Sequence, residues 1–155
     1  MHSTSLIKFL FFFVCSIFLN ACDTNNDIAI LASYPKQGAC SIDQPERNSL
    51  VDKNKGLLIR GWAYDRLNQE VPETLTLYLI NETTQKITLA TVQRGELRGD
   101  VAKAFGNPSL EASGFSGSLP SNKLQAGNYH LILLQINRKS GAIACNGEPH
   151  KITVQ

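Results

Sequence analysis

The stretch TLTLYLINETTQKITLATVQ (residues 74–93) contains two runs of β-forming residues joined by a short polar segment. In the first run Leu75, Leu77 and Leu79 alternate with polar or aromatic residues, the period of two that is typical of a strand with one buried face. The second run, residues 86–93, is rich in β-branched residues. Because the joining segment is short and polar, we expect a β-hairpin whose leucines face a hydrophobic core.

The same alternation recurs on both sides of this hairpin. In GLLIRGWAY (residues 56–64) the odd-numbered residues are small or aliphatic and share one face, whereas Trp62 and Tyr64 lie on the other. Asn146-Gly147 is a favoured tight-turn pair and is expected to separate the last two strands. Further strands are expected at residues 114–119, 129–137, 142–145 and 151–154.

Residues 94–113 interrupt this rhythm. Asp100 is a suitable N-cap for a short helix that extends to Phe105. Ala102 and Phe105 are expected to cover one end of the core, and the whole segment is expected to cross between two sheets. The sequence therefore predicts an all-β fold: a single Greek-key β-sandwich of about seven strands, with one short helix in a crossover loop.

Two local patterns resemble known β-sandwich domains. Leu124, Gly127 and Tyr129 resemble the turn into strand F of fibronectin-type and other bacterial immunoglobulin-like domains. In those domains the tyrosine hydroxyl caps the corner, so the resemblance implies the same role for Tyr129 and an immunoglobulin-like sandwich. Low-specificity motifs between residues 56 and 154 also resemble small bacterial envelope β-sandwich modules, namely Gly61-Trp62-Ala63-x-Asp65, Asp100-Val101-Ala102 and Gly114-Phe115.

The first 21 residues differ sharply from the rest of the chain. Lys8 precedes FLFFFVCSIFL (residues 9–19), an apolar run of 11 residues that is shorter than a bilayer-spanning helix requires. Such a run is typical of the hydrophobic region of a signal peptide, and a single-pass anchor is the alternative interpretation.

Leu19-Asn20-Ala21-Cys22 resembles the bacterial lipobox through its first, third and fourth residues, whereas Asn20 departs from the small or β-branched residues that family prefers. The resemblance implies a diacylated Cys22 as the new N-terminus, and ordinary cleavage after Ala21 is the alternative. We therefore expect a signal peptide (residues 1–21), a lipidated N-terminus and tether (residues 22–37), and a β-sandwich domain (residues 38–155). Residues 28–32 are apolar enough to dock on the domain as an edge strand.

Cysteine usage agrees with this scheme. Cys15 leaves with the signal peptide and Cys22 carries the lipid, which leaves Cys40 and Cys145 as one pair. An exported domain lies in an oxidising compartment, so we expect a disulfide between these two residues that links terminal strands. A metal site is the weaker interpretation, because the sequence has no C-x-x-C motif and its histidines lack ligand-like spacing.

Composition and motifs disfavour several classes of function. The net charge of +2 is not concentrated in any basic block, so a nucleic-acid partner is not expected. Ser118 lacks the G-x-S-x-G context of a hydrolase nucleophile, and His130, in phase with Ile132, is better explained as a half-buried packing residue. No cofactor or metal is expected. Asp100, the last residue of an Arg-Gly-Asp triplet, is better explained by helix capping than by recognition.

Trp62 and Tyr64 are the candidate ligand-binding residues. If they are exposed, they could stack on a sugar ring or anchor a partner protein, whereas the alternative is that Trp62 fills the core. We expect a membrane-anchored, non-catalytic envelope lipoprotein that binds, or supports, an envelope protein or glycan.

Two other functions remain open. A small inhibitor or pilotin-like assembly helper would engage its target through residues 94–113, and an envelope hydrolase is disfavoured by the missing catalytic set. Under the enterobacterial sorting rule Asp23 favours the periplasmic face of the inner membrane, and the outer membrane is the alternative.

Overall fold

The hairpin predicted from residues 74–93 is present, and one of its strands bends to join two sheets. The structure is a computed structural model that describes residues 24–139 and 141–155; the predicted signal peptide and Cys22 lie outside these residues. The helices and strands in chain order are α1 (Thr24–Ser33), β1 (Gly38–Gln44), β2 (Ser49–Val51), η1 (Lys53–Lys55), β3 (Leu57–Asp65), β4 (Thr74–Asn81), β5 (Ile87–Glu96), α2 (Gly99–Ala104), η2 (Pro108–Ser113), β6 (Gly114–Leu119), η3 (Ser121–Lys123), β7 (Gly127–Asn137), β8 (Gly141–Ala144) and β9 (His150–Val154).

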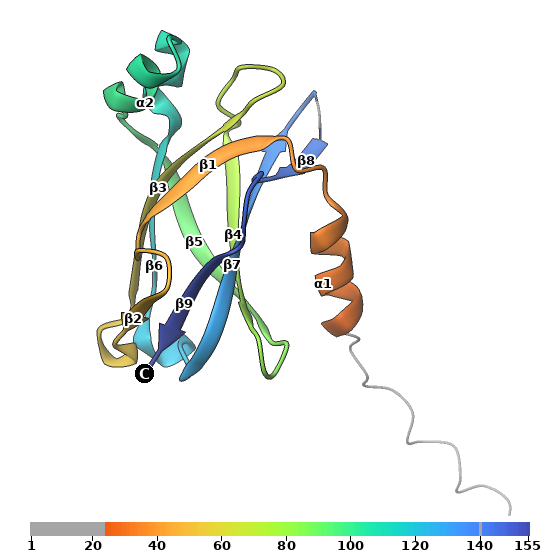
Figure 1. The fold of residues 1–155 in the computed structure, drawn as a ribbon, viewed down its shortest axis with the longest axis vertical. Helices are drawn as coiled ribbons and strands as arrows, with labels where there is room; N and C mark the ends of the chain where they lie inside the picture. Colours follow the sequence, from red (N-terminus) through yellow and green to blue (C-terminus); the bar gives the residue numbers. More distant parts are fainter. Residues whose placement is uncertain (1–23, 140) are drawn as a thin grey trace, which may run out of the picture.

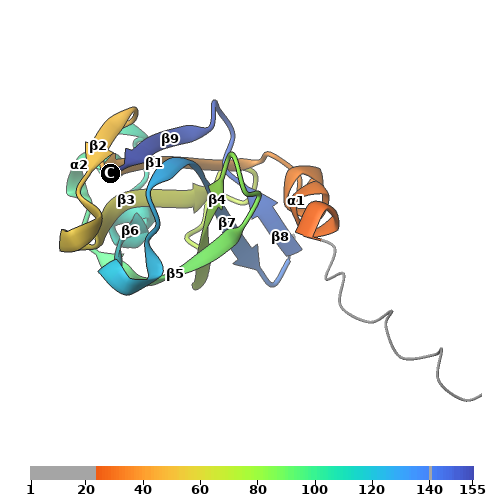
Figure 2. The same ribbon diagram turned by 90° about the horizontal axis from the view of Figure 1, so that it is seen from below.

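The described strands form two packed sheets that share β5 (Figures 1 and 2). The first sheet has the order β1-β3-β6-β5, and the second has the order β5-β4-β7-β9-β2 with β8 also paired to β7. Residues 87–90 of β5 pair with β4, and residues 91–96 pair with β6. If β1, β3, β4, β5, β6, β7 and β9 are lettered A to G, the sheets read A-B-E-D and C-F-G, the strand order of a constant-type immunoglobulin sandwich.

The core lies between the two sheets and consists of the inward-facing residues that the alternation predicted. Leu77, Leu79 and Phe115 have no exposed surface. Burying a side chain of this size contributes roughly 1.5–3 kcal/mol relative to leaving it exposed. The other core residues include Leu57, Ile59, Ala63, Leu75, Leu119, Leu131, Leu133, Ile152 and Val154. The all-β prediction is therefore confirmed: the seven expected strands are β3 to β9, and β1 and β2 are additional.

The predicted corner before β7 is also present. The Tyr129 hydroxyl donates a hydrogen bond to the backbone carbonyl of Gln125 at 3.0 Å, and Leu124 is buried beside it. Gly127 has a φ of +147°, and a Cβ at this position would lie 2.7 Å from the Nδ2 atom of Asn81. Glycine is thus required at this turn by both backbone conformation and space.

The disulfide between Cys40 and Cys145 is confirmed, with a Cα–Cα distance of 5.8 Å. Cys40 lies in β1 at the edge of the first sheet, and Cys145 directly follows β8 in the second. The bond therefore joins the two sheets along the β1 edge, where Gly38 and Cys145 also form an isolated β-bridge.

Two local predictions were wrong. Residues 94–113 do not cross between sheets, because β5 itself makes the crossing and the following segment returns to β6 within the first sheet. Asn146-Gly147 does separate β8 from β9 as predicted, and these two strands each pair with a different half of β7. Residues 28–32 belong to helix α1 and not to an edge strand.

Helix α1 packs against the outer face of the second sheet (Figure 2). Leu31 is buried there against Ile80, Leu134 and Ala144. The backbone amide of Ala144 donates to the carbonyl of Pro35 at 2.9 Å, which fixes the segment after the helix. No helix in the described ranges is long and apolar enough to cross a membrane.

Candidate ligand-binding surface

The outer face of β3 changes from open to covered along its length. Leu58 is 54% exposed, Trp62 is partly exposed and Tyr64 is only 2% exposed. The cover at the Tyr64 end comes from α2 and η2, whose residues Val101 and Leu110 pack against Tyr64. Trp62 thus lies at the boundary between the covered and open parts of this face.

Phe105, which follows α2, completes an aromatic cluster with Trp62 and Tyr64. Its ring centroid lies 5.6 Å from that of Trp62 and 5.2 Å from that of Tyr64, and the side chain is 48% exposed. The rings of Trp62 and Tyr64 are stacked at 6.1 Å. Such offset and edge contacts are favourable aromatic geometries that hold each ring in place.

This arrangement divides the predicted site residues. Trp62 is partly exposed and can contact a ligand, whereas Tyr64 is buried and stacks against the indole ring. The expectation that Phe105 covers one end of the core was wrong, because it packs on the outer face of the first sheet, and Val101 is the buried residue of α2. No local pattern links Phe105 to Trp62, since the two residues are 43 positions apart.

Small residues flank Trp62 in the sheet. Ser41 of β1 and Gly114 of β6 are its cross-strand partners. A Cβ at Gly114 would lie 2.4 Å from the carbonyl oxygen of Glu96, so a larger residue does not fit there. Cross-strand partners project on the same side of a sheet, so a small residue lies beside the indole on each strand, and the space above Gly114 is filled by Glu96 and Arg98.

A hydrogen-bonded polar border lies beside the indole. The Ser41 hydroxyl donates to Asp43 at 2.9 Å, and Asp43 accepts from the Nη1 atom of Arg98 at 2.7 Å. Arg98 also donates to both carboxylate oxygens of Asp100, at 2.9 and 2.7 Å. The Cγ atom of Arg98 lies only 2.9 Å from the position of a Cβ on Gly114, which places the guanidinium stem next to Trp62. We call Trp62 and Phe105, with this border, the Trp62 platform.

The border is preorganised by charge. The Arg98 guanidinium lowers the pKa of the Asp100 carboxyl to about 2, and the two carboxylates raise the pKa of Arg98. The predicted N-cap role of Asp100 was wrong: Arg98 occupies the N-cap position, and Asp100 lies in the first turn. Within the Arg-Gly-Asp triplet, Arg98 and Asp100 therefore form a bidentate ion pair with each other.

Arg94 supports the platform from inside the sandwich. Its guanidinium donates to the backbone carbonyls of Ala63 and Ser113 and to the Oε1 atom of Gln135. Burial lowers the pKa of Arg94 to about 10. These bonds tie β5 to β3, η2 and β7 directly beneath the end of β3 that carries the aromatic cluster.

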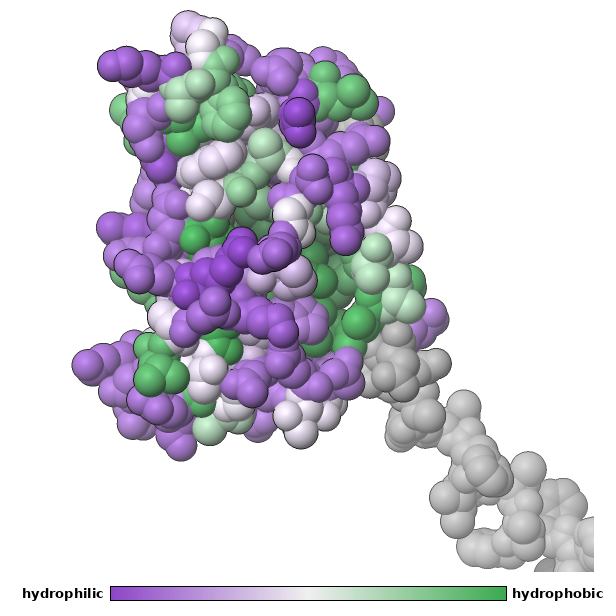
Figure 3. Space-filling view, viewed as in Figure 1, coloured by the Kyte–Doolittle hydropathy of each residue, from purple (hydrophilic) through white to green (hydrophobic). Residues whose placement is uncertain are grey.

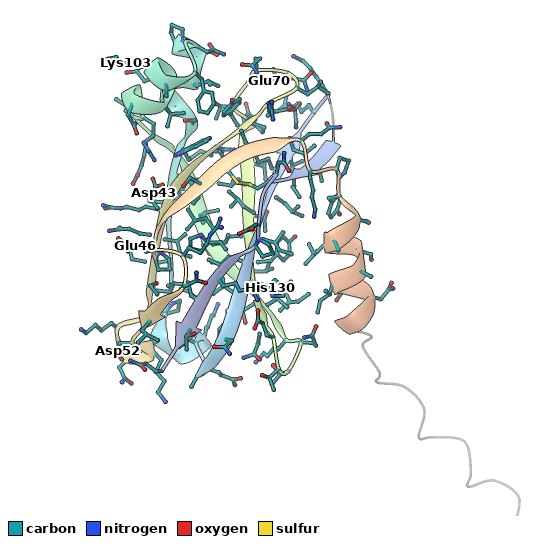
Figure 4. The ribbon with its side chains drawn as sticks, viewed as in Figure 1. Asp43, Glu46, Asp52, Glu70, Lys103 and His130 are labelled. Carbon is teal, nitrogen blue, oxygen red and sulfur yellow. A yellow bond between two sulfur atoms is a disulfide. The ribbon has the colours of Figure 1, made fainter. Side chains whose placement is uncertain are left out.

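Apart from the Trp62 platform, a hollow of about 550 Å³ lies between α1, β1 and β7. Leu131, Leu133 and Ile42 contribute apolar surface to its walls. His130 and several acidic residues also line it, but Asp43 is paired with Arg98, and Glu148 is paired with Arg47 at 3.2 Å. In Figure 4, Asp43 and Glu46 lie on the β1 side and His130 lies across the hollow on β7.

Comparison with known proteins identifies no family for this chain. No protein-family model matches the chain, and no curated protein matches it. Among solved structures, the endo-beta-1,4-mannanase from Thermotoga petrophila is similar at 13% identity and a TM-score of 0.46, over 80% of this chain and 21% of the mannanase chain. This chain therefore spans about a fifth of the mannanase's length, and a similarity at this level does not bear on activity or ligand.

The histidines of the hollow have structural partners. The Nδ1 atom of His130 lies 3.8 Å from Glu82, and its side chain is 25% exposed, as expected for a half-buried packing residue. His150 is buried, and its Nε2 atom donates to the carbonyl of Pro45 at 2.8 Å. Among residues 24–139 and 141–155, no cluster of three or more histidine, cysteine or acidic side chains could hold a metal ion.

The burial of His150 makes the fold sensitive to acid. Burial lowers the pKa of this imidazole below its ordinary value of 6.5, so the folded state favours the neutral ring. The stabilisation is therefore present above about pH 6.5 and is lost as the pH falls towards and through the lowered pKa. Between pH 7.5 and 5.5, the midpoint of urea unfolding should fall more for the wild type than for His150→Gln. Equal falls in the two proteins would show that His150 is not the group responsible.

Proposed function

We propose that this protein is a lipid-anchored, non-catalytic module of the bacterial cell envelope that binds a glycan through the Trp62 platform. The observation that best supports this proposal is the partly exposed indole of Trp62. It packs against the ring of Phe105 and is bordered by a row of polar side chains that hydrogen bond to one another. Exposed, rigid aromatic residues next to aligned polar groups are the usual anchors of binding surfaces.

The chemistry of the platform suits a sugar. The apolar C–H face of a pyranose ring can pack on the flat indole, while its hydroxyl groups exchange hydrogen bonds with the serine, carboxylate and guanidinium groups alongside. Since Asp43, Arg98 and Asp100 are already oriented by one another, a ligand would not have to order them. On the β1 side the cross-strand partner of Trp62 is the small residue Ser41, which leaves room for the ring.

The lipid anchor is proposed from the N-terminal sequence. Residues 1–21 act as the signal peptide, and Cys22 carries the acyl groups that hold the domain at the membrane. One acyl chain gives only reversible attachment, whereas two or more give a stable anchor. Asp23 favours the inner membrane under the enterobacterial rule, with the outer membrane as the alternative.

Trp62→Ala tests the glycan proposal. Removing a central aromatic anchor usually costs at least 2 kcal/mol, so binding to soluble peptidoglycan fragments or envelope polysaccharide should weaken about 30-fold or more. The matched control is Leu50→Ala in β2, which removes a 66% exposed apolar side chain outside the platform. Titration calorimetry with each glycan class measures the affinities, and thermal unfolding checks that each variant is folded.

Two outcomes would contradict the glycan proposal. One is a folded Trp62→Ala variant with wild-type affinity, and the other is a wild-type protein that binds none of the glycans. Trp62→Phe, which keeps an aromatic ring, should retain part of the affinity. Capture of an envelope protein that depends on residues 94–113, and not on Trp62, would favour the inhibitor or assembly-helper function instead.

A further inference from the structure

The outer face of the second sheet carries apolar side chains that α1 covers only in part. Under the helix, Ile80, Leu134 and Ala144 are buried against Leu31. Beyond it, Leu89 of β5 is 56% exposed and Ile136 of β7 is 46% exposed. On the helix itself, Ile30 is 46% exposed. Figure 3, which faces β1 and β9, shows the hydrophobic side chains beside α1 at the hollow between α1, β1 and β7, and β5 lies toward the far side of this view.

The uncovered residues are continuous with the helix contact. Leu89, Tyr78 and Ile132 are successive cross-strand neighbours on β5, β4 and β7. Tyr78 and Ile132 are partly buried against the cluster that contains Leu31. The row therefore forms one apolar strip that leads from exposed Leu89 to the helix. We call these three residues, with Ile30, the Leu89 strip.

The N-terminal sequence places the lipid beside this strip. Only Asp23 separates Cys22 from Thr24, where α1 begins. Two residues of extended chain span about 7 Å at most, so an acylated Cys22 cannot lie far from the start of the helix. Because Leu31 holds α1 on the outer face of the second sheet, the acyl groups would enter the membrane next to that face.

We propose that the Leu89 strip rests on the lipid bilayer in which the acyl chains of Cys22 are inserted; this inference depends on the proposed lipid anchor. An exposed apolar strip beside a membrane attachment point lowers its free energy by leaving water for the bilayer interface. The two sheets of the sandwich pack face to face, so their outer faces point in opposite directions (Figure 2). The Leu89 strip is on the outer face of the second sheet, and the Trp62 platform is on the outer face of the first. This orientation turns the platform away from the membrane.

Site-directed spin labelling tests the orientation. Leu89→Cys and Leu58→Cys are matched positions, since the native leucines are 56% and 54% exposed on the outer faces of opposite sheets. Cys40 and Cys145 are bonded to each other and Cys22 is acylated, so a nitroxide reagent reacts with the new thiol. Each lipidated variant is reconstituted in vesicles of phosphatidylethanolamine and phosphatidylglycerol, and relaxation by oxygen and by a water-soluble nickel chelate is measured.

The inference predicts opposite behaviour for the two labels. The label at residue 89 should be relaxed severalfold more by oxygen and severalfold less by the nickel chelate than the label at residue 58. The protein used must carry the acyl mass and float with the vesicles, which shows that the anchor is present. If the two labels are then equally accessible to each reagent, the inference is overturned but the anchor is not. A residue 89 label shielded from both reagents indicates a protein cover and also overturns it. A chain without acyl mass that does not float overturns the anchor itself.

Discussion

Replacing both Cys40 and Cys145 with alanine is expected to lower the free energy of unfolding by about 4–5 kcal/mol. The two residues are 105 positions apart, so the disulfide closes a loop that includes nearly the whole sandwich. In the chain-entropy model a loop of about 100 residues stabilises the fold by about 4.7 kcal/mol, because the bridge restricts the unfolded chain. A loss of this size is a large part of the 5–15 kcal/mol that holds a typical domain together.

Urea unfolding gives a direct measurement of this loss. Trp62 is the single tryptophan of the sequence, so its fluorescence reports on the fold without added labels. Reduced wild-type protein should show the same loss as the double variant, which provides the control. A difference below about 1 kcal/mol in either comparison would show that the bridge is not a main source of stability.

The fold was predictable wherever it follows from local alternation. The leucines of residues 74–93 identify a buried face without reference to the rest of the chain, because a strand turns successive side chains to opposite sides. The role of Tyr129 was implied by the resemblance to fibronectin-type domains, and the contact itself is local, since the hydroxyl bonds to Gln125 only four positions away. The disulfide followed from counting, as Cys40 and Cys145 were the one pair left.

The wrong predictions concern contacts between distant segments. Residues 94–113 were expected to cross between the sheets, but β5 makes the crossing by pairing with β4 and then with β6. Ile28 and Ile30 alternate as in a strand, yet helix α1 forms because Leu31 is buried against the second sheet. In both segments tertiary packing decides the structure.

The candidate site was predictable in part. Alternation along β3 correctly placed Trp62 and Tyr64 together on the face opposite Leu57 and Ile59, but it left open whether Trp62 fills the core. It could not show that α2 and η2 cover that face at Tyr64 and leave it open at Leu58, because this depends on how residues 97–113 fold back. The polar border was equally hidden, since Asp43 and Arg98 meet across 55 positions.

The second large effect is expected at Asp65, the last residue of β3. Its carboxylate has no exposed surface and accepts hydrogen bonds from the backbone amides of Leu67 and Asn68, at 2.9 and 3.1 Å. It also accepts from the side-chain amides of Asn68 and Asn137, at 2.8 and 2.9 Å. One buried carboxylate therefore closes the turn after β3 and links it to the end of β7.

The Asp65 network extends to the neighbouring loop. The Asn137 amide also donates to Glu70 at 2.8 Å, and Lys139 pairs with the same carboxylate at 2.9 Å. The Asn137 hydrogen bond, followed by that of Lys139, holds the pKa of Glu70 below its ordinary value. Loss of Asp65 would leave Asn137 with Glu70 as its remaining side-chain acceptor among these bonds.

Asp65→Ala is therefore expected to lower the free energy of unfolding by about 3 kcal/mol, because buried donors that lose a charged acceptor remain dehydrated. Asp65→Asn keeps one acceptor oxygen for the turn but sets its amide against that of Asn137, so a smaller loss is expected. The matched control is Asp52→Ala, since Asp52 accepts from Asn54 at 2.9 Å in an exposed turn and should cost about 1 kcal/mol. Urea unfolding of the three variants measures the order. If Asp65→Ala cost no more than Asp52→Ala, burial of the carboxylate would not account for its contribution.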